Sequence, residues 1–246
     1  MIAHNDKFKK YISKGYYEVE GWCPINFLKF AALLKQVQED VGIKIQGGAG
    51  EIGVHHGKLF IALALLNSGN KHLCIDVFGE QDFNIDRSGK GDRSIFEENL
   101  KKHAKGEYVK ILQEDSMAID DIMIDNILRE CGKFSMFSVD GCHTVEHTLN
   151  DILIAEKLVG RGGVIFVDDY YDPFWPEVQE GVNRYYATQA YKFLPLGFAF
   201  KKLALVHASS YNLLIKRIVP IAKKVTGWKL KMTKRFGYDS FSIISS

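Results

Sequence analysis

Apolar residues follow two alternating patterns along the chain. Short segments expected to be strands occur at 72–77, 108–112, 134–139 and 164–167, and those at 72–77 and 164–167 are apolar on both faces, as buried parallel strands are. Segments expected to be helical are 24–40, 57–67, 94–105, 118–131, 144–159 and 177–189. In one of them, Ser94 with Glu97 three residues on predicts a helix N-cap. The alternation predicts an α/β domain with a mainly parallel sheet, and two apolar runs within 191–206 predict an antiparallel hairpin at its end.

Acidic residues follow the predicted strands at their C-terminal ends. They are Asp76, Asp115, Asp140, Asp168 and Asp169. Parallel strands all end at one edge of the sheet, and open α/β sheets bind ligands along that edge. The spacing therefore predicts that these carboxylates share one ligand site.

The glycine-rich segment 48–53, GAGEIG, has the form GxGxxG. A dinucleotide-binding turn of this form needs a strand before it, a helix after it and an acid about 20 residues further on. Residues 43–46 would supply the strand and Asp76 the acid. This register predicts an NAD-dependent oxidoreductase.

A second register of the same segment places the strand at 48–52 and the turn at Gly53–Gly57. Glu51 at the strand end would accept hydrogen bonds from a cationic amine, and Asp76 would accept those of both ribose hydroxyls. A nucleoside that carries an amino acid, S-adenosylmethionine, suits this arrangement. The alternative without a ligand is a turn that only packs the helix on the sheet, and we favour the S-adenosylmethionine register.

A second chemical cluster follows the last two parallel strands. Asp140 and His143 lie in the segment DGCH, and Asp168 and Asp169 close a buried strand. Three converging carboxylates need a compensating charge to stay ionised, and Mg²⁺ prefers such oxygen ligands. The cluster predicts a divalent metal at Asp140, Asp168 and Asp169, with His143 as general base and Asp140 as the alternative base. Alternatively, the two later acids cap the next helix, and His143 contacts a ribose or a helix end.

Six segments together resemble the class I S-adenosylmethionine-dependent methyltransferases, in particular the macrocin O-methyltransferase-like group. They are EIGVHHGK (51–58), CIDVF (74–78), EDS (114–116), SVDGCHTVEHTLND (138–151), GGVIFVDDY (162–170) and KKLALV (201–206). The resemblance covers about residues 20–206. It implies a Rossmann-like, mostly parallel seven-stranded sheet with a terminal antiparallel hairpin and helices on both faces.

The resemblance also implies roles for individual residues. The residues expected to bind the methionine part, the ribose and the adenine of the cofactor are Glu51, Gly53, Gly57, Asp76, Asp115 and Ser116. Members with a DxxH motif and a later acidic pair bind Mg²⁺, which grips two oxygens of the substrate. Gly21-Trp22 resembles a segment that closes over the cofactor.

Composition and charge narrow the class of protein. Apolar residues make up 46% and charged residues 25% of the 246 residues, which excludes a wholly disordered chain. A net charge of +2 gives no field strong enough to imply nucleic acid. The four dispersed cysteines and the absence of an apolar signal segment at the N-terminus lead us to expect a cytoplasmic protein.

Three parts are expected along the chain: a helical lid over 1–45, a catalytic domain over 46–206 and a basic appendage over 207–246. Residues 216–235 hold eight Lys/Arg and no acid. A basic amphipathic helix here would lie on an anionic membrane surface or contact an anionic acceptor. We favour a solvated face whose apolar seam packs on its own domain or on a sister subunit of a homo-oligomer.

The function that these patterns favour is a Mg²⁺-assisted O-methyltransferase that uses S-adenosylmethionine. The expected acceptor is a hydroxyl next to a second oxygen, on a sugar or a glycosylated small molecule. Four aromatic residues would line its pocket or fold back on their own loop: Tyr170, Tyr171, Phe174 and Trp175. The alternatives are the NAD-dependent oxidoreductase and a non-catalytic scaffold that binds the cofactor.

Overall fold

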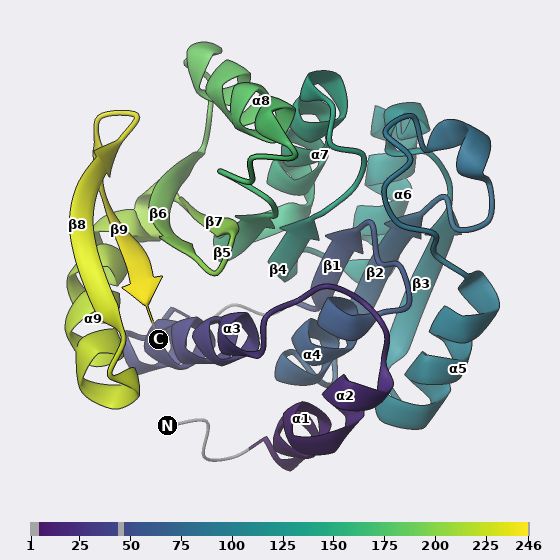
Figure 1. Ribbon diagram of the computed structural model, residues 1–246, viewed down its shortest axis with the longest axis horizontal. Coiled ribbons are helices and arrows are strands. Elements are labelled where there is room, and N and C mark those ends of the chain that lie inside the picture. The colour runs from purple at the N-terminus through teal and green to yellow at the C-terminus, as the bar shows by residue number, and fades with distance from the viewer. Residues whose placement is uncertain (1–4, 44–46, 246) are drawn as a thin grey trace.

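A single sheet of nine strands organises the described part of the computed structural model, residues 5–43 and 47–245. Its order is β3-β2-β1-β4-β5-β7-β6-β9-β8 (Figure 1). The strands are β1 Ala49–Ile52, β2 Lys71–Asp76, β3 Tyr108–Gln113, β4 Phe134–Val139, β5 Val159–Val167, β6 Phe193–Ala199, β7 Lys202–His207, β8 Lys229–Arg235 and β9 Tyr238–Ser245. Strands β1 to β5 pair in parallel, and β7 lies antiparallel between β5 and β6.

This sheet confirms the predicted α/β architecture and its terminal hairpin, but the expected number of seven strands is wrong. The two extra strands come from the C-terminal part of the chain. Strand β9 pairs in parallel with β6, and β8 pairs antiparallel with β9. The segment from Lys229 to Ser245 thus extends the same sheet.

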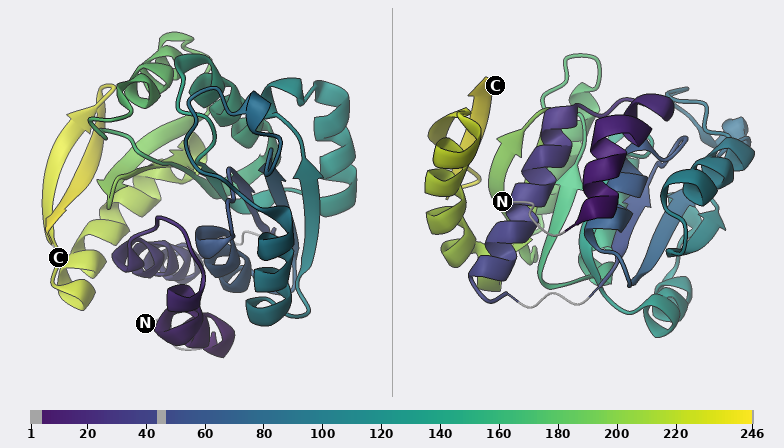
Figure 2. Two further views of the ribbon diagram at one scale, coloured as in Figure 1. Left: turned by 45° about the vertical axis from the view of Figure 1, so that its right-hand side comes forward. Right: turned by 90° about the horizontal axis from the view of Figure 1, so that it is seen from below.

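Helices cover both faces of the sheet (Figure 2). They are α1 Asp6–Lys10, α2 Tyr16–Glu18, α3 Ile25–Asp40, α4 Lys58–Leu66, α5 Arg93–His103, α6 Asp121–Cys131, α7 Val145–Leu158, α8 Pro176–Ala187 and α9 Ala208–Thr226. A π-helical turn, Tyr11–Gly15, joins α1 to α2. Helix α3 contacts both α4 and α9, and these three pack on one face, while α6, α7 and α8 pack on the other.

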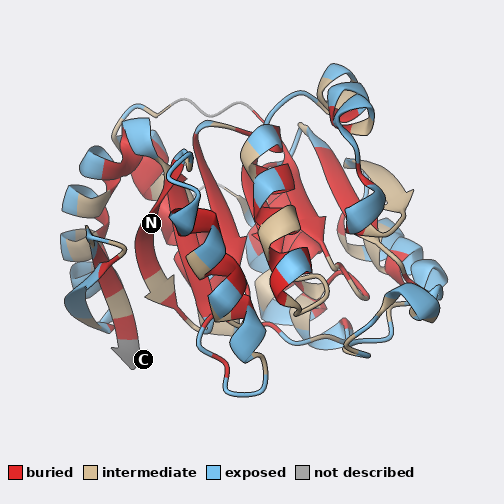
Figure 3. Cartoon of the chain, turned by 90° about the horizontal axis from the view of Figure 1, so that it is seen from above, coloured by how far each residue is buried: buried red, intermediate tan, exposed pale blue. Residues whose placement is uncertain are grey.

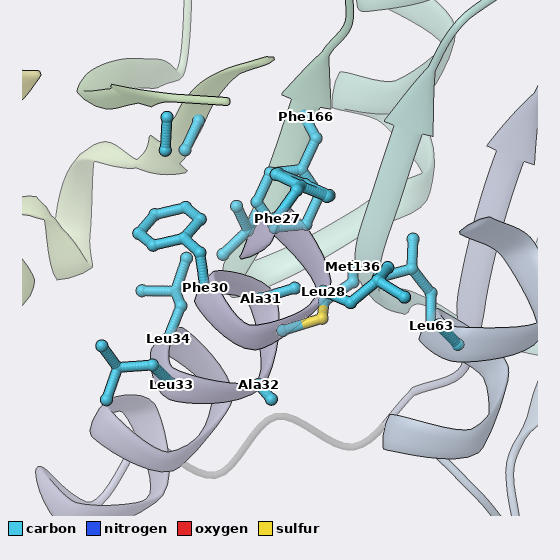
Figure 4. Close-up of a cluster of buried hydrophobic side chains, with 14 of the residues drawn as sticks. Phe27, Leu28, Phe30, Ala31, Ala32, Leu33, Leu34, Leu63, Met136 and Phe166 are labelled. Atoms are coloured by element: carbon cyan, nitrogen blue, oxygen red, sulfur yellow. The ribbon is translucent and has the colours of Figure 1, made fainter. Parts of the chain in front are cut away.

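The apolar core is split by the sheet, because successive residues of a strand point to opposite faces. In β5, Phe166 packs toward α3, whereas Ile165 and Val167 pack toward α7 and α8. The ring of Phe27 in α3 meets that of Phe166 edge-on, with centroids 5.0 Å apart (Figure 4). In Figure 3 the central strands are buried, and α6, α7 and α8 each have buried and exposed residues.

Four of the described helices begin at short polar side chains that accept a hydrogen bond from the first turn, as N-caps do, and Asn5 caps α1 in this way. Asp120 caps α6, and Thr144 caps α7. The cap of α5 is Asp92, whose Oδ1 accepts from the backbone N–H of Ile95 at 3.0 Å. The predicted cap at Ser94 is therefore wrong, because the helix begins one residue before it.

The C-terminal helix α9 uses its apolar side within the molecule. Leu214, Ile218 and Ala222 are fully buried, and the helix contacts α3 and β6. Its lysines and arginine at 216, 217, 223 and 224 are exposed. Among the described residues, no helix is both long and apolar enough to cross a bilayer.

Adjacent leucines of α9 give a matched test of this packing. Leu214 is fully buried, whereas Leu213 is 42% exposed. We expect Leu214→Ala to lower the free energy of unfolding by about 2–5 kcal/mol, the usual cost of a cavity in a core. Leu213→Ala should change it by less than about 1 kcal/mol. Urea denaturation of both variants measures the free energy of unfolding. Equal decreases in the two variants would show that α9 does not pack as described.

Candidate functional site

A cavity of about 890 Å³ opens at the C-terminal ends of β1, β2, β4 and β5, beyond the arrowheads of these strands in Figure 1. All five acids predicted at the strand ends line it. Glu51, Gly53, Ser116 and His143 line it too. Gly57 does not; it lies beneath the turn, where a Cβ would meet the ring of Phe96 at 2.9 Å.

The glycine turn follows the second register. Strand β1 covers Ala49–Ile52, so Gly50 lies inside the strand, where a Cβ would stand 2.3 Å from the ring of Phe137. Gly53 has φ +80°, and a Cβ there would stand 1.8 Å from the carbonyl oxygen of Asp140. The turn must therefore start at Gly53, and a dinucleotide turn over 48–53 is wrong. The dinucleotide register also needs a strand at 43–46, and residues 44–46 of it lie outside the described residues.

Glu51 offers a buried carboxyl group to the cavity. It is 2% exposed, and its Oε2 has no hydrogen-bond partner within the described part of the chain. Burial raises the pKa of this carboxyl to about 8. A buried carboxylate without partners is costly, so the site favours a cationic or hydrogen-bond-donating ligand here.

Two further acids are held by the backbone at the cavity wall. Asp76 accepts from the N–H of His55 at 2.8 Å and from that of Phe78 at 2.6 Å. Asp115 accepts from the N–H of Met117 at 2.9 Å. Because each oxygen has a second lone pair, both carboxylates are positioned to accept hydrogen bonds from a ligand.

The N-terminal segment forms another wall. Residues 20–24 line the cavity, so the predicted closing segment Gly21-Trp22 lies at its rim. The indole of Trp22 is 75% exposed, and its centroid is 5.2 Å from that of His55. A ligand held by the glycine turn would lie next to this exposed ring.

A buried cation contacts acids of the cavity wall from behind. The side chain of Lys202, the first residue of β7, is fully buried and forms an ion pair with Asp168; its Nζ is 3.5 Å from Oδ2 of Asp140. Burial raises the pKa of Asp168, but the Lys202 ammonium outweighs this effect and holds the pKa below its usual range. Burial and the neighbouring Asp168 raise the pKa of Asp140 well above its usual value.

His143 is enclosed by three groups. Its Nδ1 is 2.7 Å from Oδ2 of Asp86, which also accepts from the backbone N–H of His143 at 2.6 Å. Its Nε2 is 3.4 Å from Oδ2 of Asp169, and the indole of Trp175 stacks on the ring at 4.2 Å. Burial lowers the pKa of His143, but the nearby carboxylates of Asp169 and Asp86 outweigh this effect and raise it to about 10.

The three carboxylates predicted to hold Mg²⁺ do not fit that ion in this arrangement. Asp168 and Asp140 face the Lys202 ammonium, and a monovalent and a divalent cation about 4 Å apart repel by roughly 8 kcal/mol at an effective dielectric constant of about 20. Among the described residues, Asp140, His143 and Asp169 have ligand atoms within 4.8 Å of one another. His143 of this group already pairs with Asp86 and Asp169, and these carboxylates raise its pKa to about 10, so a metal ion bound there would have to displace a firmly held proton.

Two residues of this site escape sequence reasoning. Asp86 lies in the loop between β2 and α5, where no pattern indicates which side chain turns inward. Lys202 has a weak signal, since a lysine beginning the apolar run LALV must find a counter-ion if that strand is central. The sequence alone does not identify that counter-ion, because Asp168 becomes a neighbour of Lys202 only through the pairing of β7 with β5.

Comparisons with known proteins agree with this geometry. A family model described as a methyltransferase domain matches residues 51–170. The O-methyltransferase NovP has a TM-score of 0.57 at 16% identity, over 75% of this chain and 80% of its own. CalS11, a calicheamicin methyltransferase, has a TM-score of 0.53 at 14% identity, over 82% of this chain and 90% of its own. At these identities the structural likenesses show a shared fold.

A viral relative matches a shorter segment. The uncharacterized protein R132 of Acanthamoeba polyphaga mimivirus is 40% identical over 62 residues, which are 24% of this chain. The match spans 28% of that relative's length.

The pair of Asp86 and His143 makes stability depend on pH. The pKa of His143 in the folded protein, about 10, lies above its ordinary value of 6.5. The contribution of the charged His143 ring to the free energy of unfolding is therefore fully present below pH 6.5 and is lost as the pH rises through about 10. We expect Asp86→Asn to be less stable than the wild type at pH 7, and the difference to shrink by pH 10, as measured by urea denaturation.

Asp82→Asn, at an exposed position of the same loop, serves as the control and should show no such trend. A difference between Asp86→Asn and the wild type that stays constant from pH 7 to pH 10 would mean that Asp86 acts only through the backbone N–H of His143. Titration of the His143 ring by NMR should show a lowered pKa in Asp86→Asn.

Proposed function

The chain belongs to the methyltransferase-domain family, and from this premise we propose that it transfers a methyl group from S-adenosylmethionine to a hydroxyl oxygen of a small molecule. The observation that carries the proposal is the single cavity that joins the Glu51–Gly57 turn to the cluster of Asp140 and His143. One end of it suits a nucleoside bearing an amino acid, and the other suits an acceptor that must lose a proton.

The cofactor end is assigned from unsatisfied groups. The unpaired Oε2 of Glu51 would accept from the α-amino group of the methionine part. Asp76 would accept from the ribose hydroxyls, and Asp115 with Ser116 would lie by the adenine. S-adenosylmethionine bears a sulfonium, and the acids around this cavity favour that positive charge.

At the other end, Asp140 is the group we assign as the general base. In the transfer, the acceptor oxygen attacks the methyl carbon, the bond from carbon to sulfur breaks, and the hydroxyl proton passes to a base. His143 was the first expectation, but a ring with a pKa of about 10 already holds its proton at neutral pH. Asp140 lines the cavity, and although burial and Asp168 raise its pKa, the Lys202 ammonium 3.5 Å away favours the ionised form that accepts a proton.

His143 then acts as a fixed hydrogen-bond donor. Asp86 holds its Nδ1 side, and the stacked Trp175 fixes the plane of its ring. An imidazolium beside the acceptor would stabilise the negative charge that develops on the oxygen as its proton leaves.

For the acceptor we propose a sugar or a glycosylated small molecule. The cavity, about 890 Å³, lies near the upper end of the range of about 300–1,000 Å³ for ligand pockets, which leaves room for an acceptor beside the cofactor. Phe174 and Trp175 line it, and flat aromatic faces pack well against sugar rings. CalS11, which shares the fold, is a TDP-rhamnose 3′-O-methyltransferase.

Magnesium assistance, expected from the sequence, stays a prediction outside this mechanism. Two of its three expected ligands face Lys202. Each step above is therefore assigned to groups of the chain itself.

Binding of S-adenosylhomocysteine tests the cofactor end. We expect calorimetric titration to show binding to the wild type, and Asp76→Asn to weaken it roughly 10- to 150-fold, since hydrogen bonds to a charged group contribute about 1.5–3 kcal/mol. Asp82→Asn, exposed in the loop that follows β2, should bind like the wild type. Binding of NADH in place of S-adenosylhomocysteine would overturn the proposal.

Turnover tests the base. Formation of S-adenosylhomocysteine with a panel of sugar nucleotides and glycosides would identify an acceptor. With that acceptor we expect Asp140→Asn to lower kcat about 10²- to 10⁴-fold, with the affinity for S-adenosylhomocysteine retained. His143→Gln should lower kcat less. If the two variants show the opposite order, His143 is the base.

A further inference from the structure

Lys202 is placed at the acidic cluster by the register of the sheet. Strand β7 runs antiparallel to β5, and Leu203 pairs with Val167. The residue before Leu203 therefore lies beside the residue after Val167, which is Asp168. A charged pair at the end of two central strands thus follows from the strand register.

The Lys202 side chain is fully buried, and its surroundings hold it in one place. Alternation along β7 sends Lys202 to the face that α3 covers, and its Nζ lies 5.4 Å from the centroid of Phe27 in α3. The ammonium contacts Asp168 and lies 3.5 Å from Asp140. It therefore faces a ring on one side and carboxylates on the other.

We propose that Lys202 takes the place of a divalent metal in this protein. Its ammonium supplies the positive charge that lets Asp140 and Asp168 lie side by side, and it orients Asp140 toward the acceptor. Lys202 is thus a positioning residue, and the cluster works without a bound metal. The role of Asp140 rests on the proposed function, whereas the replacement of the metal does not.

The charges of the cluster support this assignment. Two adjacent buried carboxylates disfavour each other's ionisation, and one nearby cation offsets this effect. Without the ammonium, Asp140 and Asp168 would be left as a carboxylate pair with no cation between them, and hard divalent ions bind such oxygen ligands. Exchanging this one side chain should therefore convert a metal-independent cluster into a metal-binding one.

The decisive variant is Lys202→Met, which keeps a long side chain and removes the charge. Lys201→Met is the matched control, since it removes the same charge from the neighbouring residue, whose side chain is 62% exposed, pairs with Asp172 and lies 3.9 Å from Oδ1 of Asp169. Each protein is titrated with MnCl2 and MgCl2 alone by calorimetry, and its Tm is measured with and without the metals.

We expect neither metal to bind the wild type or Lys201→Met at micromolar concentrations, and neither to raise their Tm. Lys202→Met should have a lower Tm than the wild type, and millimolar Mn²⁺ should raise it. Its affinity for Mn²⁺ should exceed that of the wild type by at least roughly tenfold, because the repulsion by the ammonium is gone. Micromolar binding of Mn²⁺ by the wild type would overturn the proposal, as would a Lys202→Met variant that gains no affinity.

A double variant checks that the new site uses Asp168. Asp168→Asn combined with Lys202→Met removes both members of the ion pair, and we expect it to bind Mn²⁺ no more tightly than the wild type. If Lys202→Met does not fold by itself, refolding with millimolar Mn²⁺ should recover folded protein. Failure to recover it counts against the proposal. None of these measurements uses methyl transfer, so failure of the proposed function would leave them unchanged.

Discussion

The acidic edge of the sheet depends on one buried positive charge, the ammonium of Lys202. Parallel strands bring their C-terminal residues to the same edge, and here those residues are carboxylates. Without a counter-ion, their mutual repulsion and loss of hydration would oppose folding. With Lys202 against Asp168 and near Asp140, the strands can end together. The negative charge of these cavity-lining acids is thus compensated by a lysine of the chain itself.

A second set of contacts controls the orientation of His143. The residues that contact its ring lie in three places: Asp86 in the loop after β2, Asp169 at the end of β5, and Trp175 in the segment before α8. Three separate parts of the chain therefore converge on one imidazole. Such support from several directions keeps a functional ring within a narrow range of positions.

The sequence predicts those parts of the molecule that depend on local patterns. Apolar runs locate the parallel strands, and the acids that follow them mark the correct edge, because each pattern is complete within a few residues. The role of Lys202 requires knowing that β7 inserts beside β5, and that of Asp86 requires the path of an irregular loop. Strand β8 escapes prediction because it is lysine-rich and mostly exposed, and its polar-apolar alternation is limited to Lys229–Met232.

The same lysines have a consequence for how the molecule meets copies of itself. Strand β8 is the last strand on its side of the sheet, and a free edge presents unpaired backbone groups to any passing strand. Lys229, Lys231 and Lys234 are exposed along it. Two such edges approaching each other would bring like charges together, so the basic composition of this strand protects the extended sheet from edge-to-edge aggregation.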